Sequence, residues 1–229
     1  MNTGQTISQT HCIRCGTCCV KGGPALHRED ALLFKKGILS RHDVYTLRKG
    51  EVVRHVDDTL KELEEEIVKI KGQGGGWTCM FFDNDKTRCA IYQDRPLECR
   101  VLQCWDHHAL QRAMEKPYLQ RRDLLGIHDG LLKLITSHDQ RCGYDTLKAA
   151  VRQVEGSDPD KGVERVLDLL QYDDFMRPFL IEKLRISPDT MDFLFGRPLT
   201  ETIRRFGLQV KMDGETRMLV PLERKTPSG

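Results

Sequence analysis

The stretch HCIRCGTCC, residues 11–19, places four cysteines within eight positions: Cys12, Cys15, Cys18 and Cys19. Cysteine thiolates are soft ligands that suit zinc, copper(I) and iron–sulfur clusters. The first three form a CxxCxxC run, the opening with which bacterial ferredoxins wrap three corners of a cubane cluster before a distant cysteine completes the site. The spacing therefore favours a [4Fe–4S] cluster.

Four more cysteines follow at wider spacing: Cys79, Cys89, Cys99 and Cys104. A zinc ribbon or finger usually draws two ligands from each of two short loops, and no second CxxC pair follows Cys19. Eight sulfurs allow one or two four-cysteine centres, and the spacing leaves their pairing open. We predict that all eight are metal ligands, for an iron–sulfur cluster first and for zinc as the alternative.

Two pairs of these cysteines are predicted to serve different centres. Adjacent residues send their side chains in diverging directions, so Cys18 and Cys19 are not expected to bind one tetrahedral ion. If a helix that begins near residue 96 is continuous, Cys99 and Cys104 lie about 140° apart around it. They too would then face different centres.

Positive charge is expected next to Cys99. Asp94 is a plausible N-cap, with Pro96 in the first helical turn, so that Cys99 falls near a helix N-terminus. Such a position lowers a thiolate pKa, and Arg95 and Arg100 flank the cysteine. These charges would favour the reduced, more negative form of a cluster.

Other notable residues receive simpler interpretations. Cys142 is predicted to be structural, because it has no nearby ligand partner. His107 and His108 make a mixed cysteine and histidine site conceivable, but a surface or supporting role is preferred. Trp77 and Tyr92 are predicted to form core around the metal loops.

The composition narrows the setting. The chain has 229 residues, with 36 Lys and Arg against 34 Asp and Glu, and the basic residues are scattered rather than gathered into one stripe. Nucleic acid is therefore not an expected partner. Residues 1–10 lack an apolar signal region, and no run of eighteen apolar residues follows, so we expect a cytoplasmic protein that does not bind membranes. In that compartment thiols stay reduced, and dense cysteines indicate metal or redox chemistry.

The elements that must position the cysteines predict an α+β fold. Residues 1–110 form a small irregular metal-bound domain, with a helix over 41–48, a helical period over 52–67, and strands from Glu66 around the glycine-rich turn and at 87–92. Residues 111–229 form a mainly helical region that ends in a β-hairpin around residues 213–214. Its predicted helices cover 118–136, 144–154 and 162–172 and the run after Ser187, with a surface loop at 155–162.

The cysteine motifs resemble a known family. The octet CIRCGTCC, Cys79 followed by an aromatic pair, and the string CAIYQDRPLECR at residues 89–100 are similar to the CxxCxxCC (YkgJ-type) cysteine cluster family, a zinc- or iron-chelating domain. The resemblance covers roughly residues 10–105. It implies a cysteine-bound metal centre, foremost an iron–sulfur cluster, and it implies no particular reaction.

Three functions remain open. The first is an iron–sulfur protein that passes electrons to a redox partner or supports a partner enzyme, and the second is a zinc-stabilised binding or scaffold module. The third is a cluster-dependent enzyme such as a protein lysine methylase, because a flagellin lysine methylase belongs to the same broad group. The chain has no nucleotide-binding glycine motif, and Gly22 stands where the radical-SAM spacing CxxxCxxC needs its last cysteine. No catalytic residue is assigned.

Overall fold

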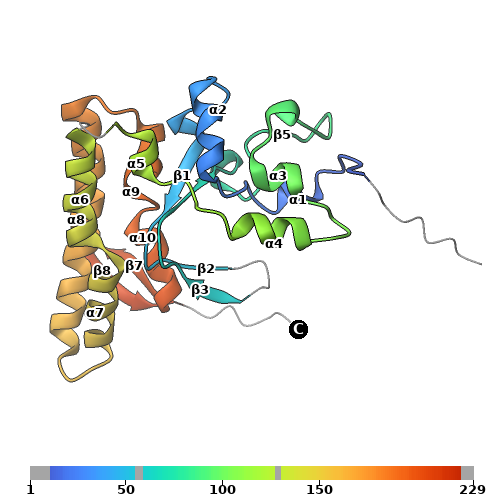
Figure 1. Cartoon of the computed structure of the whole chain (residues 1–229). Coiled ribbons are helices and arrows are strands. Elements are labelled where there is room, and N and C mark those ends of the chain that lie inside the picture. Colours follow the sequence, from blue (N-terminus) through green and yellow to red (C-terminus); the bar gives the residue numbers. More distant parts are fainter. Residues whose placement is uncertain (1–10, 55–58, 127–129, 223–229) are drawn as a thin grey trace, which may run out of the picture.

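The computed structural model describes residues 11–54, 59–126 and 130–222. Figure 1 shows α6, α7 and α8 side by side along one edge, and α1, α3, α4 and β5 at the opposite end. The helices of the described residues are α1 (Thr17–Val20), α2 (Ala31–Lys35), α3 (Leu97–Val101), α4 (His108–Met114), α5 (Arg121–Leu124), α6 (Gly130–Cys142), α7 (Tyr144–Val154), α8 (Pro159–Leu184), α9 (Met191–Phe195) and α10 (Leu199–Thr202). None of these helices is both long enough and apolar enough to cross a membrane.

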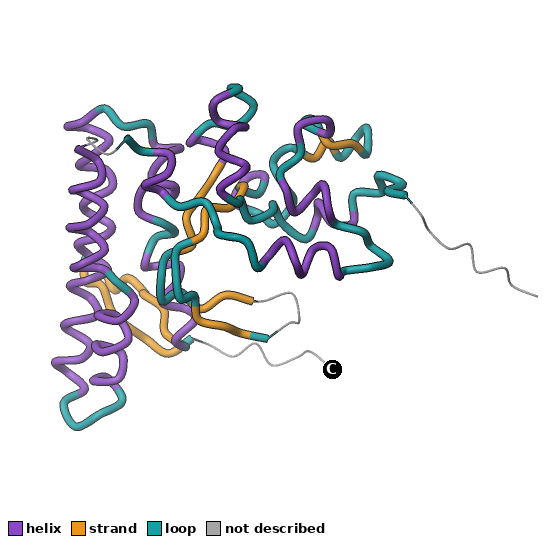
Figure 2. The backbone as a smooth tube through the Cα atoms, viewed as in Figure 1, coloured by secondary structure: helices purple, strands orange, loops and turns teal. Residues whose placement is uncertain are grey.

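The strands of the described residues form four separate antiparallel pairs, which are the only sheets in this part of the chain (Figure 2). The pairs are β1 (Val44–Leu47) with β4 (Ile67–Ile70), β2 (Val52–Arg54) with β3 (Leu60–Glu62), β5 (Phe82–Asp83) with β6 (Arg88–Cys89), and β7 (Leu208–Asp213) with β8 (Thr216–Pro221). A two-stranded sheet is marginally stable alone in water. These pairs therefore depend on what they pack against.

One hydrophobic core joins the two ends of the chain. Leu26, Val44 and Val68 pack in the same buried cluster as Leu119 and Phe193. The Thr46 hydroxyl of β1 also donates a 2.6 Å hydrogen bond to the carbonyl of Phe193 in α9. The short strands that lead to the cysteines are thus supported by helices from the second half, and the predicted boundary near residue 110 stays a prediction.

A second core lies between α7, α8, α10 and the C-terminal hairpin. Cys142 is fully buried there, with its Sγ atom 3.8 Å from the carbonyl oxygen of Leu169, as expected for a structural cysteine. The turn between α7 and α8 brings the helices so close that a Cβ at Gly162 would lie 2.3 Å from the nitrogen of Val154. Glycine at this position allows the close approach.

The α+β class and the C-terminal hairpin were predicted correctly, and α7 has the predicted bounds. Strand β4 begins close to the expected start at Glu66, and α8 extends the helix expected over 162–172 in both directions. The helix predicted over 118–136 is wrong as one element, because α5 ends at Leu124 and α6 begins at Gly130, with 127–129 outside the described residues.

Two helices predicted near the strands are also wrong. Within 41–48 the chain makes a short 3-10 turn, stopped by a capping box between Ser40 and Asp43, and then enters β1. Within 52–67 it forms β2 and β3, and residues 55–58 lie outside the described residues. In both places pairing with another strand overrides the local helical pattern.

Buried charged side chains lock α6, α8 and α10 together. The Asp173 carboxylate accepts hydrogen bonds from His138 Nε2 at 2.8 Å, from Arg177 Nη2 at 3.1 Å and from the backbone nitrogen of Leu199 at 2.8 Å. Burial by itself would raise the pKa of Asp173, but the His138 hydrogen bond and the Arg177 charge outweigh it and lower the pKa to about 2. The ionised carboxylate therefore stabilises the fold.

We predict that Asp173→Asn lowers the free energy of unfolding by about 3 kcal/mol at pH 7, because it leaves buried cationic and N–H groups without their partner. The lowered pKa gives a stabilisation that is present above about pH 4 and is lost as the pH falls toward 2, so the difference between wild type and variant should narrow over that range. Urea unfolding at pH 7, 4 and 3 measures this difference.

The neighbouring variant Asp174→Asn is a matched control. Asp174 pairs with Arg217 at a partly exposed site, where an ion pair contributes less than about 1 kcal/mol. Equal losses of stability in the two variants would contradict the role given to Asp173.

Candidate metal centre

A single cavity of about 310 Å³ is lined by every cysteine that the sequence predicted as a ligand. They come from the loop before α1 and α1 itself, the segment before β5, β6, α3 and the turn after α3: Cys12, Cys15, Cys18, Cys19, Cys79, Cys89, Cys99 and Cys104. The elements that carry them lie at the same end of the molecule (Figure 1). The fold thus brings eight thiols from distant segments together, while their role as ligands stays a prediction.

The rest of the cavity wall is mostly apolar. Ile70, Phe82, Ile91 and Leu102 contribute to it. The one carboxylate in the lining belongs to Glu98, whose Oε2 atom accepts a 2.8 Å hydrogen bond from the nitrogen of Ala25. The thiols are therefore the main donors for a metal.

The first cysteine loop is shaped by two left-handed residues. Arg14 has φ +58° and Gly16 has φ +78°, which curl the chain between the first and third cysteines before α1 begins. Gly16 also packs directly on the ring of Phe82, so that a Cβ at this position would lie 2.1 Å from Phe82 Cζ. Only glycine fits this turn and this contact together.

Cys18 and Cys19 do not diverge as predicted. Both lie in the first turn of α1, and their Sγ atoms are 3.9 Å apart. Two thiolates on one tetrahedral metal with bonds of about 2.3 Å are separated by about 3.8 Å, so these sulfurs can share one metal atom. The hydrogen bond between them lowers the pKa of Cys18 to about 6 and raises the pKa of Cys19.

The continuous helix assumed for Cys99 and Cys104 is also wrong. α3 ends at Val101, and Cys104 lies in the following turn, so both thiols can line one cavity. Cys99 lies in the first turn of α3 as expected, but the residue before the helix is Pro96, and Asp94 belongs to a separate 3-10 turn.

Burial governs the ionisation of the later cysteines. Desolvation raises the pKa of Cys79, Cys89, Cys99 and Cys104, with the largest effect at Cys99. A thiol must lose its proton to bind a metal, so metal binding here releases protons.

The two arginines next to Cys99 have different roles. Arg95 lines the cavity, donates from Nε to the carbonyl of Tyr92 at 2.9 Å and from Nη1 to the carbonyl of Cys99 at 3.4 Å. Arg100 instead pairs with Glu29 at 2.7 Å on the surface and is not part of the cavity lining. Of the two predicted charges, only Arg95 lies at the cavity.

Some aromatic and histidine side chains near the cysteines line the cavity, and others lie at the surface. Tyr92 is half-buried and lines the cavity, whereas Trp77 is 68% exposed, so its predicted place in the core is wrong. Gly76 and the preceding glycines hold this segment in an open turn at the surface. His107 and His108 are exposed and do not line the cavity, in agreement with a surface role.

Sequence reasoning missed three charged residues of the wall, Arg14, Lys21 and Glu98. Arg14 and Glu98 stand directly beside a cysteine in the quoted motifs, and this adjacency was the available signal for them. The direction of each side chain depends on the left-handed turn of the first loop and on α3, which the spacing does not specify.

The thiols surround the cavity without converging on one point. Within 11–54, 59–126 and 130–222, no three His, Cys, Asp or Glu side chains are arranged to hold a single metal ion. The volume is about ten times the ~30 Å³ that one water molecule occupies in the liquid. The cavity thus has room for more than one metal atom.

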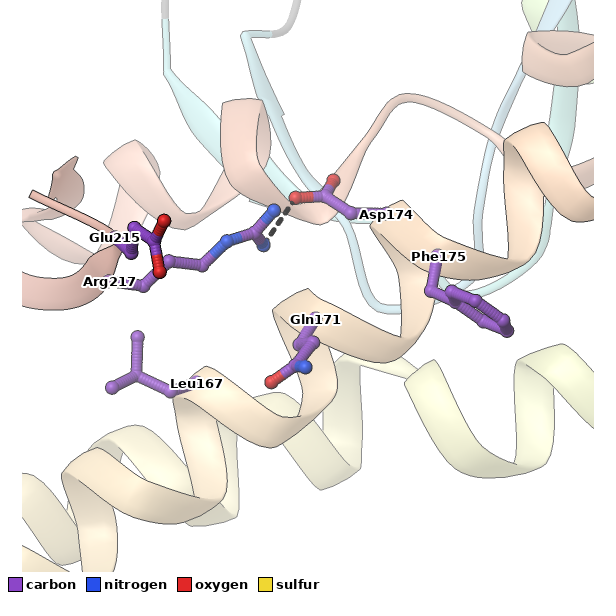
Figure 3. Close-up of a pocket in the computed structure, with 6 residues that line it drawn as sticks. All are labelled: Leu167, Gln171, Asp174, Phe175, Glu215 and Arg217. Atoms are coloured by element: carbon purple, nitrogen blue, oxygen red, sulfur yellow. Dashed lines mark hydrogen bonds and ion pairs between the residues drawn. The ribbon is translucent and has the colours of Figure 1, made fainter.

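A second depression, between α8 and the C-terminal hairpin, has different chemistry (Figure 3). Asp174 and Arg217 point toward one another there and form a 2.7 Å ion pair, while Leu167 and Phe175 supply apolar surface. It contains no thiol, and we do not assign a metal to it.

A cavity lined by eight thiols has the donor chemistry of a cysteine-ligated metal site. Residues 11–119 match the model of the CxxCxxCC family, described as "Putative zinc- or iron-chelating domain". This match agrees with the resemblance seen in the sequence and supports a cysteine-ligated metal site. No curated protein sequence and no solved structure matches the chain.

We predict that Gly16→Ala reduces the bound metal by more than half, because the new Cβ would overlap the Phe82 ring and displace the first cysteine loop. Gly37→Ala is the matched control: Gly37 has φ +70° but open space around a Cβ, so it should cost about 1 kcal/mol of backbone strain and leave the metal content unchanged. Elemental analysis of the purified proteins measures both, and equal metal content in the two variants would contradict the packing argument.

Proposed function

We propose that this domain binds an iron–sulfur cluster, [4Fe–4S] in type and one or two in number, and that the protein passes electrons to a partner protein or supports a partner enzyme. The observation that carries the proposal is the convergence of eight thiols on one cavity. The setting we propose is the cytoplasm, where such thiols stay reduced.

The residues present fit such a group. The donors are soft thiols, with no histidine in the lining and a single carboxylate that is already hydrogen-bonded to the backbone. The CxxCxxC run supplies three ligands from one loop, as in bacterial ferredoxins. The cavity exceeds the needs of one ion, and its thiols are spread around the wall. Together these features favour a multinuclear iron–sulfur core over a single zinc ion.

When bound, an iron–sulfur cluster supplies one-electron transfer at a potential set by its burial and by hydrogen bonds to its sulfurs. In this chain Cys12, Cys15 and Cys18 would hold it from one loop, with further thiols from the later segments. The backbone nitrogen of Arg14 donates to Cys12 Sγ at 3.4 Å, which stabilises negative charge on that sulfur. Arg95 adds a positive charge to the wall and favours a reduced state.

The same cavity suggests where a partner would approach. Cys12, Cys15 and Cys104 are exposed, whereas Cys79 is buried. A centre held by these thiols would have one side near the surface, and electrons would have a short path to a docked protein. We therefore propose that the redox partner or enzyme binds over the exposed cysteines.

A zinc-stabilised binding module is the second candidate. It is favoured by the 3.9 Å separation of the Cys18 and Cys19 sulfurs, which is close to that of two thiolates on one zinc ion. Such a module would be colourless and would unfold when a chelator removes the metal.

We predict that protein purified without air is brown and contains iron and acid-labile sulfide, at about four of each per cluster. The measurement is iron, zinc and sulfide content together with an absorption spectrum. Stoichiometric zinc in a colourless sample from iron-replete cells would overturn the iron–sulfur proposal and favour the zinc module.

A pair of cysteine variants tests the location of the centre. Cys15→Ser should abolish or convert the centre, because it removes a sulfur of the first loop, and it should destabilise the first region. Cys142→Ser should leave the metal content within error of wild type, since Cys142 lies in the second core. Metal analysis and thermal unfolding measure these effects, and equal losses of metal in both variants would contradict the assignment.

A further inference from the structure

Two arginines lie over one tyrosine ring at the edge of the cavity. The guanidinium carbon of Arg14 is 4.0 Å from the centroid of the Tyr92 ring, and that of Arg95 is 3.8 Å from it. All three side chains line the cavity. Cations at this distance over an aromatic ring are attracted by its electron-rich face. We call this group the Arg14–Tyr92–Arg95 triad.

The triad joins the two cysteine motifs. Arg14 lies between Cys12 and Cys15, whereas Tyr92 and Arg95 lie between Cys89 and Cys99. Arg14 and Tyr92 stand 78 positions apart in the sequence, and the two motifs themselves are separated by the 70 positions from Cys19 to Cys89. The ring contact therefore bridges parts of the chain that only the fold brings together.

The Tyr92 and Arg95 side of the triad is held firmly. Arg95 donates to the carbonyls of Tyr92 and Cys99, and its own carbonyl accepts a 2.9 Å hydrogen bond from Arg100. Its guanidinium is thus fixed both by hydrogen bonds and by the ring. The Tyr92 ring that Arg14 contacts is therefore packed against a fixed neighbour.

The Arg14 side, in contrast, belongs to an exposed loop. Cys12, Ile13, Arg14 and Cys15 are all exposed, and Gly16 is the buried residue that anchors the loop against Phe82. The left-handed backbone of Arg14 directs its side chain to Tyr92. The ring contact is therefore well placed to hold the loop over the cavity.

We propose that the Arg14–Tyr92–Arg95 triad closes the metal centre. It positions the thiols of Cys12 and Cys15 over the cavity, and it sets two permanent positive charges beside a centre made negative by thiolates. The three are positioning residues that act through the cysteines. The inference rests on the proposed function only in requiring a thiolate-bound metal, and it holds for iron–sulfur or zinc.

The test measures how fast the full-length protein loses its own metal to excess EDTA. Tyr92→Leu keeps an apolar side chain but removes the ring, and it should release metal about tenfold faster. Tyr92→Phe keeps the ring and should stay within about twofold of wild type. Release from Tyr92→Leu at the wild-type rate, or equally fast release from both variants, would overturn the inference.

Arg14 variants provide a second test if Tyr92→Leu folds poorly. Arg14 is exposed, so its substitution should not prevent folding. Arg14→Gln should release metal about as fast as Tyr92→Leu and should make the potential of an iron–sulfur centre more negative. Arg14→Lys keeps the charge without the planar stack, so release should still be accelerated while the potential stays near wild type. Arg112→Gln, which removes an exposed charge outside the cavity lining, should change neither quantity.

The outcomes separate the two proposals. Wild-type protein without thiol-bound metal would overturn both the function and the triad. Metal that is present but leaves wild type, Arg14→Gln and Arg112→Gln at one rate would overturn the triad alone and leave the function standing.

Discussion

The gathering of eight thiols around one small apolar cavity is the constraint on which the rest of the structure depends. Thiols in such surroundings resist ionisation, as the raised pKa of Cys79 and Cys99 indicates. A metal that binds them creates negative charge where little water can solvate it. The cavity wall contains groups that stabilise this negative charge. They are the guanidinium groups of Arg14 and Arg95 and the backbone N–H of Arg14, which donates to Cys12.

The segments that carry the thiols have little secondary structure of their own to hold the thiols around the cavity. Their sheets have two short strands each, and their helices α1 and α3 span four and five residues. The second half of the chain supplies the missing support, because β1 shares a core and a hydrogen bond with α9. The charged network around Asp173 in turn fixes α6, α8 and α10. The helices thus support the β1–β4 pair, whose residue Ile70 lines the cavity.

The sequence was most informative where a pattern is local. Residues 144–154 have apolar residues at helical spacing and follow Gly143, and they form α7. The aspartate–glycine turn predicted the C-terminal hairpin. The cysteines were recognised by type and spacing, and the fold places all eight at one cavity. Where the outcome depends on distant partners, local patterns were insufficient: residues 52–54 pair with 60–62 despite a helical period.

Side-chain directions were the hardest to foresee. Cys18 and Cys19 lie next to each other on α1 with their sulfurs 3.9 Å apart, although adjacent helical residues do not ordinarily face one another. The exposure of Trp77 follows from a glycine-rich turn at the surface. The position of Cys104 depends on where α3 ends. Each depends on a backbone conformation that only the complete fold determines.

The uneven exposure of the thiols gives the cavity two unlike sides. The buried Cys79 lies in the segment before β5, and the half-buried Cys89 and Cys99 lie on β6 and α3. Cys12, Cys15 and Cys104 are exposed. An incoming metal carrier would meet the surface cysteines first, and a damaging oxidant would reach the same side. Delivery of the metal and its protection from air would therefore both depend on the side that carries the exposed cysteines.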